Sequence, residues 1–297
     1  MTRLKEVDLD ENPFDFYALP GCMTDPGSHS DLFLDLPTDL AKLCQVVQGN
    51  LLHIFWAQRY GRTLTEAEQQ TVNVRPVAEK LALMRAVDSH PLGAPRPLEK
   101  RQVGNCRDFT LLLTSILRYQ GVPARARCGF GAYFESNRYE DHWVCEYWNS
   151  SRTRWVMVDS QLDELQREAL GIRFDPLDVP ADQFITGGKA WQMCRTGQAD
   201  PQQFGIFDMH GWWFIWGDLV RDFLALNKVE ILPWDGGWGF LNHKLLDPPP
   251  AEADLPFYDR IAVLTLGGDA AFPQVRAEYA ADSRWKLPPE MVPNNLK

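Results

Sequence analysis

Three residues in the middle of the chain have the types and the order of a thiol-based catalytic set: Cys106, His142 and Asp159. Cys106 follows Gly104 and Asn105 and opens a run with helical apolar spacing. At that position the helix dipole and free backbone N–H groups favour a thiolate and can stabilise a developing oxyanion. His142 can accept the thiol proton, and Asp159 can orient the imidazole. The pattern predicts that Cys106 is a nucleophile.

The elements around these residues predict a helix followed by an antiparallel sheet, an α+β order. Apolar residues recur at intervals of three and four after Cys106, which predicts one buried helical face that ends before Gly121. Three strand-like segments follow, at residues 124–134, 142–148 and 154–159. The turn-forming stretch 149–153 predicts that the last two form a hairpin, with His142 and Asp159 side by side at its open end.

The flanking regions predict mainly helical structure. A capped helix is expected from about residue 39 to 60, and the region after Asp159 is rich in Trp and contains helical patterns. We expect a helical N-terminal part over 1–100, a catalytic core over 101–175 and a Trp-rich, mainly helical extension over 176–297. A single compact domain with the same elements is an equally good interpretation.

Net charge, hydropathy and cysteine usage argue against nucleic-acid-binding, membrane-spanning and disulfide-rich secreted proteins. The formal net charge is −10, which argues against nucleic acid as a partner. No apolar run reaches the length of a membrane span, and residues 1–17 contain no signal-peptide pattern. The six scattered cysteines are too few for a disulfide framework. We expect a cytoplasmic protein with reduced thiols, and composition leaves the oligomeric state open.

The segment 104–130, "GNCRDFTLLLTSILRYQGVPARARCGF", followed by "DHWVCEYW" and "WVMVDSQLD", resembles the core of the transglutaminase-like superfamily. The resemblance covers roughly residues 100–163, and the flanks resemble a bacterial-type member. It implies a papain-like fold, in which a Cys-bearing helix packs on an antiparallel sheet. It also implies that Cys106 is the nucleophile, His142 the general base and Asp159 the orienting acid. Ser160 and Gln161 depart from the Pro-Thr that many members have there.

The resemblance implies acyl transfer through a thioester on a peptide or small amide substrate. An amine that resolves the thioester makes the enzyme a transferase, and water makes it a hydrolase; the triad alone does not distinguish the two. A cysteine peptidase or a peptide-glycan amidase would use the same triad. A non-catalytic binding protein on this fold is the remaining alternative.

Four further residues are candidates for the site. Gln102 could donate to the oxyanion, since Gln has this role in papain-like enzymes, although a solvent-exposed loop position is the alternative. Aromatic residues could form the wall of a substrate cleft, although clustered aromatics are more typical of a core. These aromatic candidates are Trp143, Trp212 and Trp213.

We expect neither a metal site nor a cofactor. Cys128, His142 and Cys145 include two zinc-ligand types, but they lack a paired cysteine spacing. Cys145 also lies three residues from His142, so on a strand it would face the opposite side.

Overall fold

The computed structural model describes residues 11–242 and 250–293, in which a mixed β-sheet lies between two layers of helices. The sheet has the order β6-β3-β4-β7-β8, and β5 pairs with β4 as well. Its strands are β3 (Ala124–Gly131), β4 (Tyr139–Asn149), β5 (Arg154–Val158), β6 (Phe184–Thr186), β7 (Phe204–Ile206) and β8 (Met209–His210). A separate parallel pair consists of β1 (Leu51–His53) and β2 (Gln102–Gly104).

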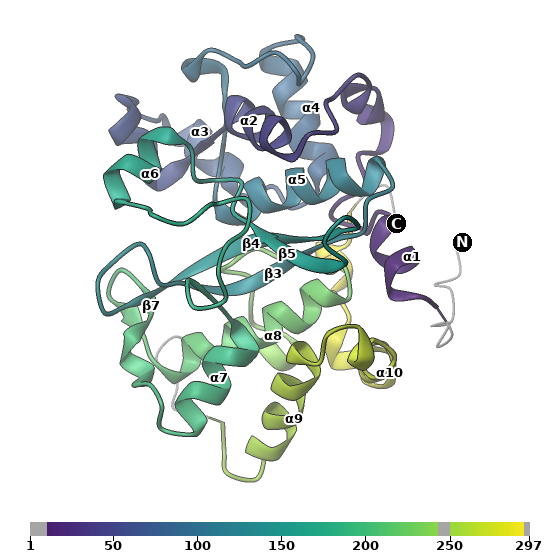
Figure 1. Ribbon diagram of the computed structural model, residues 1–297, viewed down its shortest axis with the longest axis vertical. Helices are drawn as coiled ribbons and strands as arrows, with labels where there is room; N and C mark the ends of the chain where they lie inside the picture. The colour runs from purple at the N-terminus through teal and green to yellow at the C-terminus, as the bar shows by residue number, and fades with distance from the viewer. Residues whose placement is uncertain (1–10, 243–249, 294–297) are drawn as a thin grey trace.

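One helical layer comes mainly from the N-terminal half of the chain and the other from its C-terminal part (Figure 1). The layer that includes the central helix α5 contains α2 (Leu40–Asn50), α3 (Glu66–Gln70), α4 (Val77–Val87), α5 (Cys106–Tyr119) and α6 (Glu164–Leu170). The opposite layer contains α7 (Gly187–Arg195), α8 (Trp212–Leu226), α9 (Leu255–Leu266) and α10 (Phe272–Ala281), and the short α1 (Pro13–Ala18) lies at the side. Helix α5 packs on β3 and β4, and α8 packs on β3 from the other side.

The hairpin predicted around residues 149–153 is present. Asn149 pairs with Arg154 and Cys145 with Val158, so β4 and β5 run antiparallel into that turn. β4 starts earlier than expected, at Tyr139, which places His142 inside the strand opposite Gly129 of β3. Gly129 is required there because a Cβ would lie 2.2 Å from the carbonyl oxygen of residue 185 in the neighbouring β6.

The fold class is confirmed: a helix that begins with Cys106 packs on a largely antiparallel sheet, with helical flanks. The sheet is mixed rather than purely antiparallel, because β7 pairs in parallel with β4. The predicted helix over 39–60 is interrupted by the strand β1, after which residues 54–60 form a short 3-10 helix that ends before Gly61. Helix α2 ends at Asn50, whose side-chain amide bonds the carbonyl oxygens of Val46 and Leu92, and the next residues pair with β2 instead. The division at residues 100 and 175 stays a prediction.

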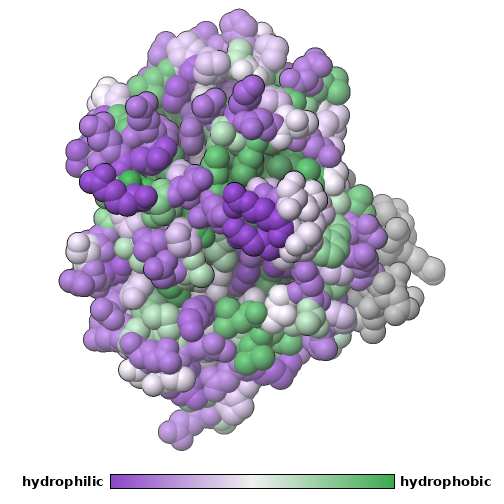
Figure 2. Space-filling model, viewed as in Figure 1, coloured by the Kyte–Doolittle hydropathy of each residue, from purple (hydrophilic) through white to green (hydrophobic). Residues whose placement is uncertain are grey.

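Among the described helices, none combines the length and the apolar character that crossing a bilayer requires. The face in Figure 2 is mostly hydrophilic, with small separate hydrophobic patches. Scattered apolar side chains of this kind are normal on a protein surface.

Candidate active site

A cavity of about 360 Å³ lies at the N-terminal end of α5. Cys106 and His142 both line it, and Asp159 lies directly behind His142. Most of its wall is apolar, and aromatic rings dominate: Phe55, Trp56, Phe134, Phe207, Trp213, Phe214 and Trp234. A mainly apolar cavity with a few converging polar groups is the usual form of a small-molecule or peptide site.

Helix α5 holds Cys106 at its first position through a capping box. The side chain of Asn105 accepts the backbone N–H of Asp108 at 3.2 Å, and the Asp108 carboxylate accepts the backbone N–H of Asn105 at 3.0 Å. Gly104 must lack a side chain, because a Cβ there would lie 2.8 Å from the Asp108 carboxylate. The Gly-Asn-Cys sequence is therefore the local requirement for this helix start.

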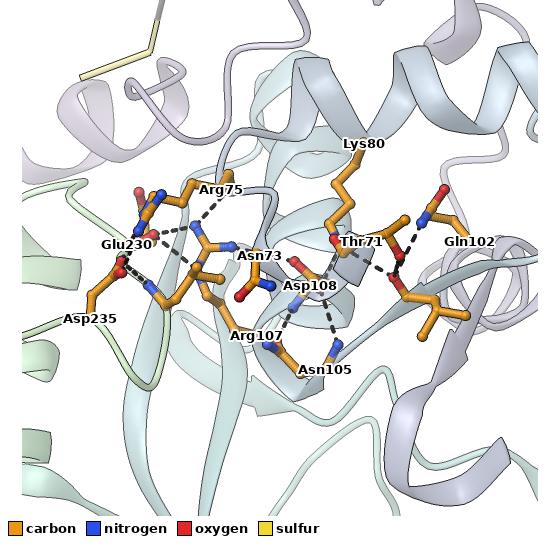
Figure 3. Close-up of polar contacts among 12 residues, drawn as sticks. Thr71, Asn73, Arg75, Lys80, Gln102, Asn105, Arg107, Asp108, Glu230 and Asp235 are labelled. Atoms are coloured by element: carbon orange, nitrogen blue, oxygen red, sulfur yellow. Dashed lines mark hydrogen bonds and ion pairs between the residues drawn. The ribbon is translucent and has the colours of Figure 1, made fainter. Parts of the chain in front are cut away.

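Ion pairs and hydrogen bonds hold the same turn of α5 (Figure 3). Lys80 lies 2.9 Å from the Asp108 carboxylate, and the fully buried Arg107 donates from Nε to the carbonyl oxygen of Glu230 at 2.9 Å. Arg75 forms two hydrogen bonds with Asp235, one of the residues that line the cavity. These contacts connect α4, α5 and the loop after α8, and they keep the first turn of α5 in place relative to the cavity.

His142 and Asp159 form the hydrogen bond that the hairpin predicted. Nε2 of His142 lies 2.8 Å from Oδ2 of Asp159, and both side chains are almost fully buried. Tyr133 donates its hydroxyl to the same carboxylate at 2.7 Å, and the backbone N–H of Gln161 donates at 3.0 Å. Burial alone would raise the pKa of Asp159, but His142 and these donors hold it below its ordinary value. The carboxylate therefore stays ionised and orients the imidazole, with Nδ1 as the ring nitrogen that can accept a proton.

The resting state of Cys106 differs from the sequence expectation. Burial raises the pKa of the Cys106 thiol well above its ordinary value, and the Asp141 carboxylate adds to this effect. Backbone hydrogen bonds with Trp143 and Arg107 act in the opposite direction but do not outweigh burial. Burial therefore favours the neutral thiol. Nucleophilic attack by Cys106 would require a base such as His142 to remove the thiol proton.

Of the four remaining candidate residues, only one lines the cavity. Trp213 lines the cavity. Trp143 instead is 1% exposed and packs in the core beneath α5, and Trp212 packs edge-on against Trp191; neither lines the cavity within the described residues. Gln102 is buried in β2 rather than exposed, and its amide donates to the carbonyl of Val103 at 3.3 Å (Figure 3). It is not among the residues that line the cavity. Its role as an oxyanion donor stays a prediction without a supporting contact.

Sequence reasoning missed three polar residues at the site. His53 lines the cavity from the end of β1, Asp141 lines it beside His142, and Tyr133 supports Asp159. The position of Asp141 directly before His142 was a usable signal. No local pattern indicates His53, because its position depends on the pairing of β1 with β2.

One group in the described residues has the types of metal ligands. Cys128 Sγ and carboxyl oxygens of Asp141 and Asp218 all lie within 4.8 Å of one another. Burial raises the pKa of both carboxyls, and Arg221 lies beside Asp218, so the surroundings disfavour the anionic ligands that a cation needs. Cys145 accepts a hydrogen bond from Thr114 at 3.4 Å and is not part of this group. The absence of a metal site stays a prediction.

Comparison with known protein families gives a match within the chain. The model of the transglutaminase-like superfamily core matches residues 63–160. These residues belong to the transglutaminase-like superfamily. The matched transglutaminase-like core contains Cys106, His142 and Asp159, but not β1 with His53.

A solved structure, described as "a Putative Cysteine Protease from Cytophaga hutchinsonii", has 16% sequence identity to the chain. That match covers 52% of this chain and 47% of the other, with a TM-score of 0.21. The chain therefore spans about half the length of that protein. No curated protein matches the chain.

Proposed function

We propose that this chain is a cysteine enzyme that performs acyl transfer or hydrolysis on an amide or peptide substrate through a thioester at Cys106. The observation that carries the proposal is the hydrogen bond between His142 and Asp159, which uses Nε2 of the imidazole and leaves Nδ1 to accept the Cys106 proton. Cys106 and His142 line the same cavity. The same fold would also serve a cysteine peptidase or a peptide-glycan amidase.

The chemistry follows from these positions. Cys106 Sγ forms a bond to the carbonyl carbon while His142 takes the thiol proton, and the carbonyl π electrons move to oxygen. When the electron pair on oxygen re-forms the carbonyl double bond, the C–N bond breaks and His142 gives its proton to the departing nitrogen. Water or an amine then attacks the thioester carbonyl carbon and loses a proton to His142. The C–S bond breaks, and His142 returns the proton to Sγ of Cys106.

Aromatic side chains at the edge of the cavity support a partly apolar substrate. Phe55, Phe207 and Trp234 line the cavity and are 53%, 61% and 48% exposed. The rings of Phe55 and Phe207 meet edge to face with 4.9 Å between their centroids. Large exposed aromatics gathered at one site are typical of binding surfaces, so we expect an apolar group next to the cleaved bond.

The test is the acyl adduct on Cys106. Incubation with p-nitrophenyl acetate, and then with a mixed library of amides, esters and peptides, should place one acyl group on Cys106, as shown by peptide mass spectrometry. Cys106→Ala should lower turnover of any accepted substrate by about 10⁴-fold or more, as for loss of a catalytic triad member. Cys194→Ala, which changes a buried thiol outside the cavity, is the matched control. Turnover that persists in Cys106→Ala would overturn the proposal.

A further inference from the structure

His53 is a second buried imidazole in the cavity wall, and the triad chemistry does not use it. It ends β1, and the parallel pairing of β1 with β2 places it opposite Gly104, two residues before Cys106. It is 6% exposed and lines the cavity together with Cys106 and His142. The N-terminal segment thus contributes a polar group next to the nucleophile.

The ring of His53 presents one defined hydrogen-bond donor. Nδ1 accepts the backbone N–H of Phe55 at 3.3 Å, so the ring proton lies on Nε2. Burial, and after it the nearby His142, lowers the pKa of His53 to about 3, which keeps the ring neutral. In the described parts of the chain, no residue accepts a hydrogen bond from this Nε2–H. A donor in a cavity wall that has no protein acceptor is the kind of group that a ligand oxygen satisfies.

We propose that the Nε2–H of His53 donates to the substrate carbonyl oxygen while Cys106 attacks, and that the backbone N–H of Cys106 is the second donor. This inference rests on the proposed function. The negative charge that develops on oxygen is then stabilised by two donors that are in place before the reaction starts. A neutral imidazole suits this role, because it polarises the carbonyl without carrying a charge of its own.

A purely structural role is the alternative, since His53 also caps the helical turn over 54–60. Three variants separate the two roles. His53→Ser keeps a side-chain oxygen that can accept the Phe55 N–H but removes the Nε2–H donor, because the serine side chain is too short to place its hydroxyl there. His53→Gln retains an amide N–H near the position of Nε2. His53→Phe keeps a planar ring but has no hydrogen-bond donor, and it replaces His53→Ser in the test if that variant does not fold.

The experiment compares two reactions of the same thiol. Acylation of Cys106 by p-nitrophenyl acetate passes through an oxyanion, whereas alkylation by iodoacetamide does not. His53→Ser and His53→Phe should slow acylation by about 10²–10³-fold, the loss typical of one oxyanion donor, with alkylation within threefold of the unmodified protein. His53→Gln should recover most of the acylation rate. His90→Ser is the matched control, because His90 is exposed and lies outside the cavity lining.

The outcomes are distinct. Acylation at the unmodified rate in His53→Ser and His53→Phe, or an equal loss of acylation and alkylation, would overturn the role of His53 and leave the proposed function intact. A native protein that is alkylated but never acylated at Cys106 would overturn the proposed function, and the role of His53 with it.

Discussion

Two buried polar clusters lie where α8 meets the sheet, and their charges are arranged in opposite ways. Asp218 and Asp222 are four residues apart on α8, and each is at most 1% exposed. Around Asp222 the charges balance. Arg127 binds it with two hydrogen bonds of 2.9 and 2.8 Å and shares Glu146 with Arg125. We call these four side chains, Arg125, Arg127, Glu146 and Asp222, the paired cluster.

Around Asp218 the charges do not balance. Asp218, Asp141 and Cys128 form the carboxyl cluster, and the nearest cation is Arg221, whose Nη1 lies 3.3 Å from Asp218. Burial raises the pKa of Asp141 to about 6, which Arg221, His142 and a hydrogen bond with Asp218 only partly offset. Burial and the Asp141 charge raise the pKa of Asp218 well above its ordinary value. One proton is therefore held between two carboxyls.

The comparison shows that pairing, rather than burial, decides the charge of these acids. In the paired cluster the two guanidinium groups hold the pKa of Glu146 below its ordinary value, although burial alone would raise it. The paired cluster connects α8 to β3 and β4, whereas the carboxyl cluster reaches the cavity through Asp141. Acids whose pKa is raised beside a cavity are typical of functional sites, whereas fully paired ones are typical of structural sites.

Breaking the paired cluster should have the largest effect on stability. Asp222→Ala leaves the buried Arg127 without its two-point partner, and loss of one member of a buried ion pair costs about 3–5 kcal/mol. Urea unfolding followed by circular dichroism measures the change. Arg260→Ala, which removes an exposed pair with Glu278, is the control and should cost less than about 1 kcal/mol. Equal losses in the two variants would contradict the structural role of the paired cluster.

The elements formed by neighbouring residues were predictable from the sequence, whereas contacts between distant segments were not. The helix from Cys106 and the hairpin were predictable, because apolar periodicity and turn residues act locally. The His142–Asp159 contact followed from the hairpin alone.

Contacts between distant segments carry no such local signal. Asp141 meets Asp218 only because α8 packs on β3, and His53 reaches the cavity only because β1 pairs with β2. The reactive state of Cys106 was misjudged for the same reason. The helix dipole can be read locally, whereas burial and the Asp141 charge depend on the assembled fold.

Removing one acid of the carboxyl cluster should stabilise the protein. A carboxyl with a raised pKa holds a proton that the unfolded chain releases, so its own contribution to stability is fully present below about pH 4 and is lost as the pH rises through about 6. Asp218→Asn should remove this loss and add about 1–3 kcal/mol at pH 8, because one pKa unit corresponds to about 1.4 kcal/mol. Urea midpoints measured from pH 4 to pH 8 provide the test. A variant whose stability falls with pH as steeply as that of the native protein would show that the two acids are ionised in the fold.

The smallest expected effect connects the carboxyl cluster to the Cys106 thiol. Because the Asp141 charge adds to burial in raising the pKa of Cys106, Asp141→Asn should lower that pKa and increase the thiolate fraction at neutral pH. A thiolate of lower pKa is also a weaker nucleophile, so alkylation by iodoacetamide should accelerate by only about threefold for each pKa unit. The rate measured from pH 6 to pH 10 should therefore rise at a lower pH than in the native protein. Glu135→Gln, an exposed change, should leave the profile in place. An unshifted profile in Asp141→Asn would mean that the carboxyl cluster is electrically separate from Cys106 and that burial alone sets the state of the thiol.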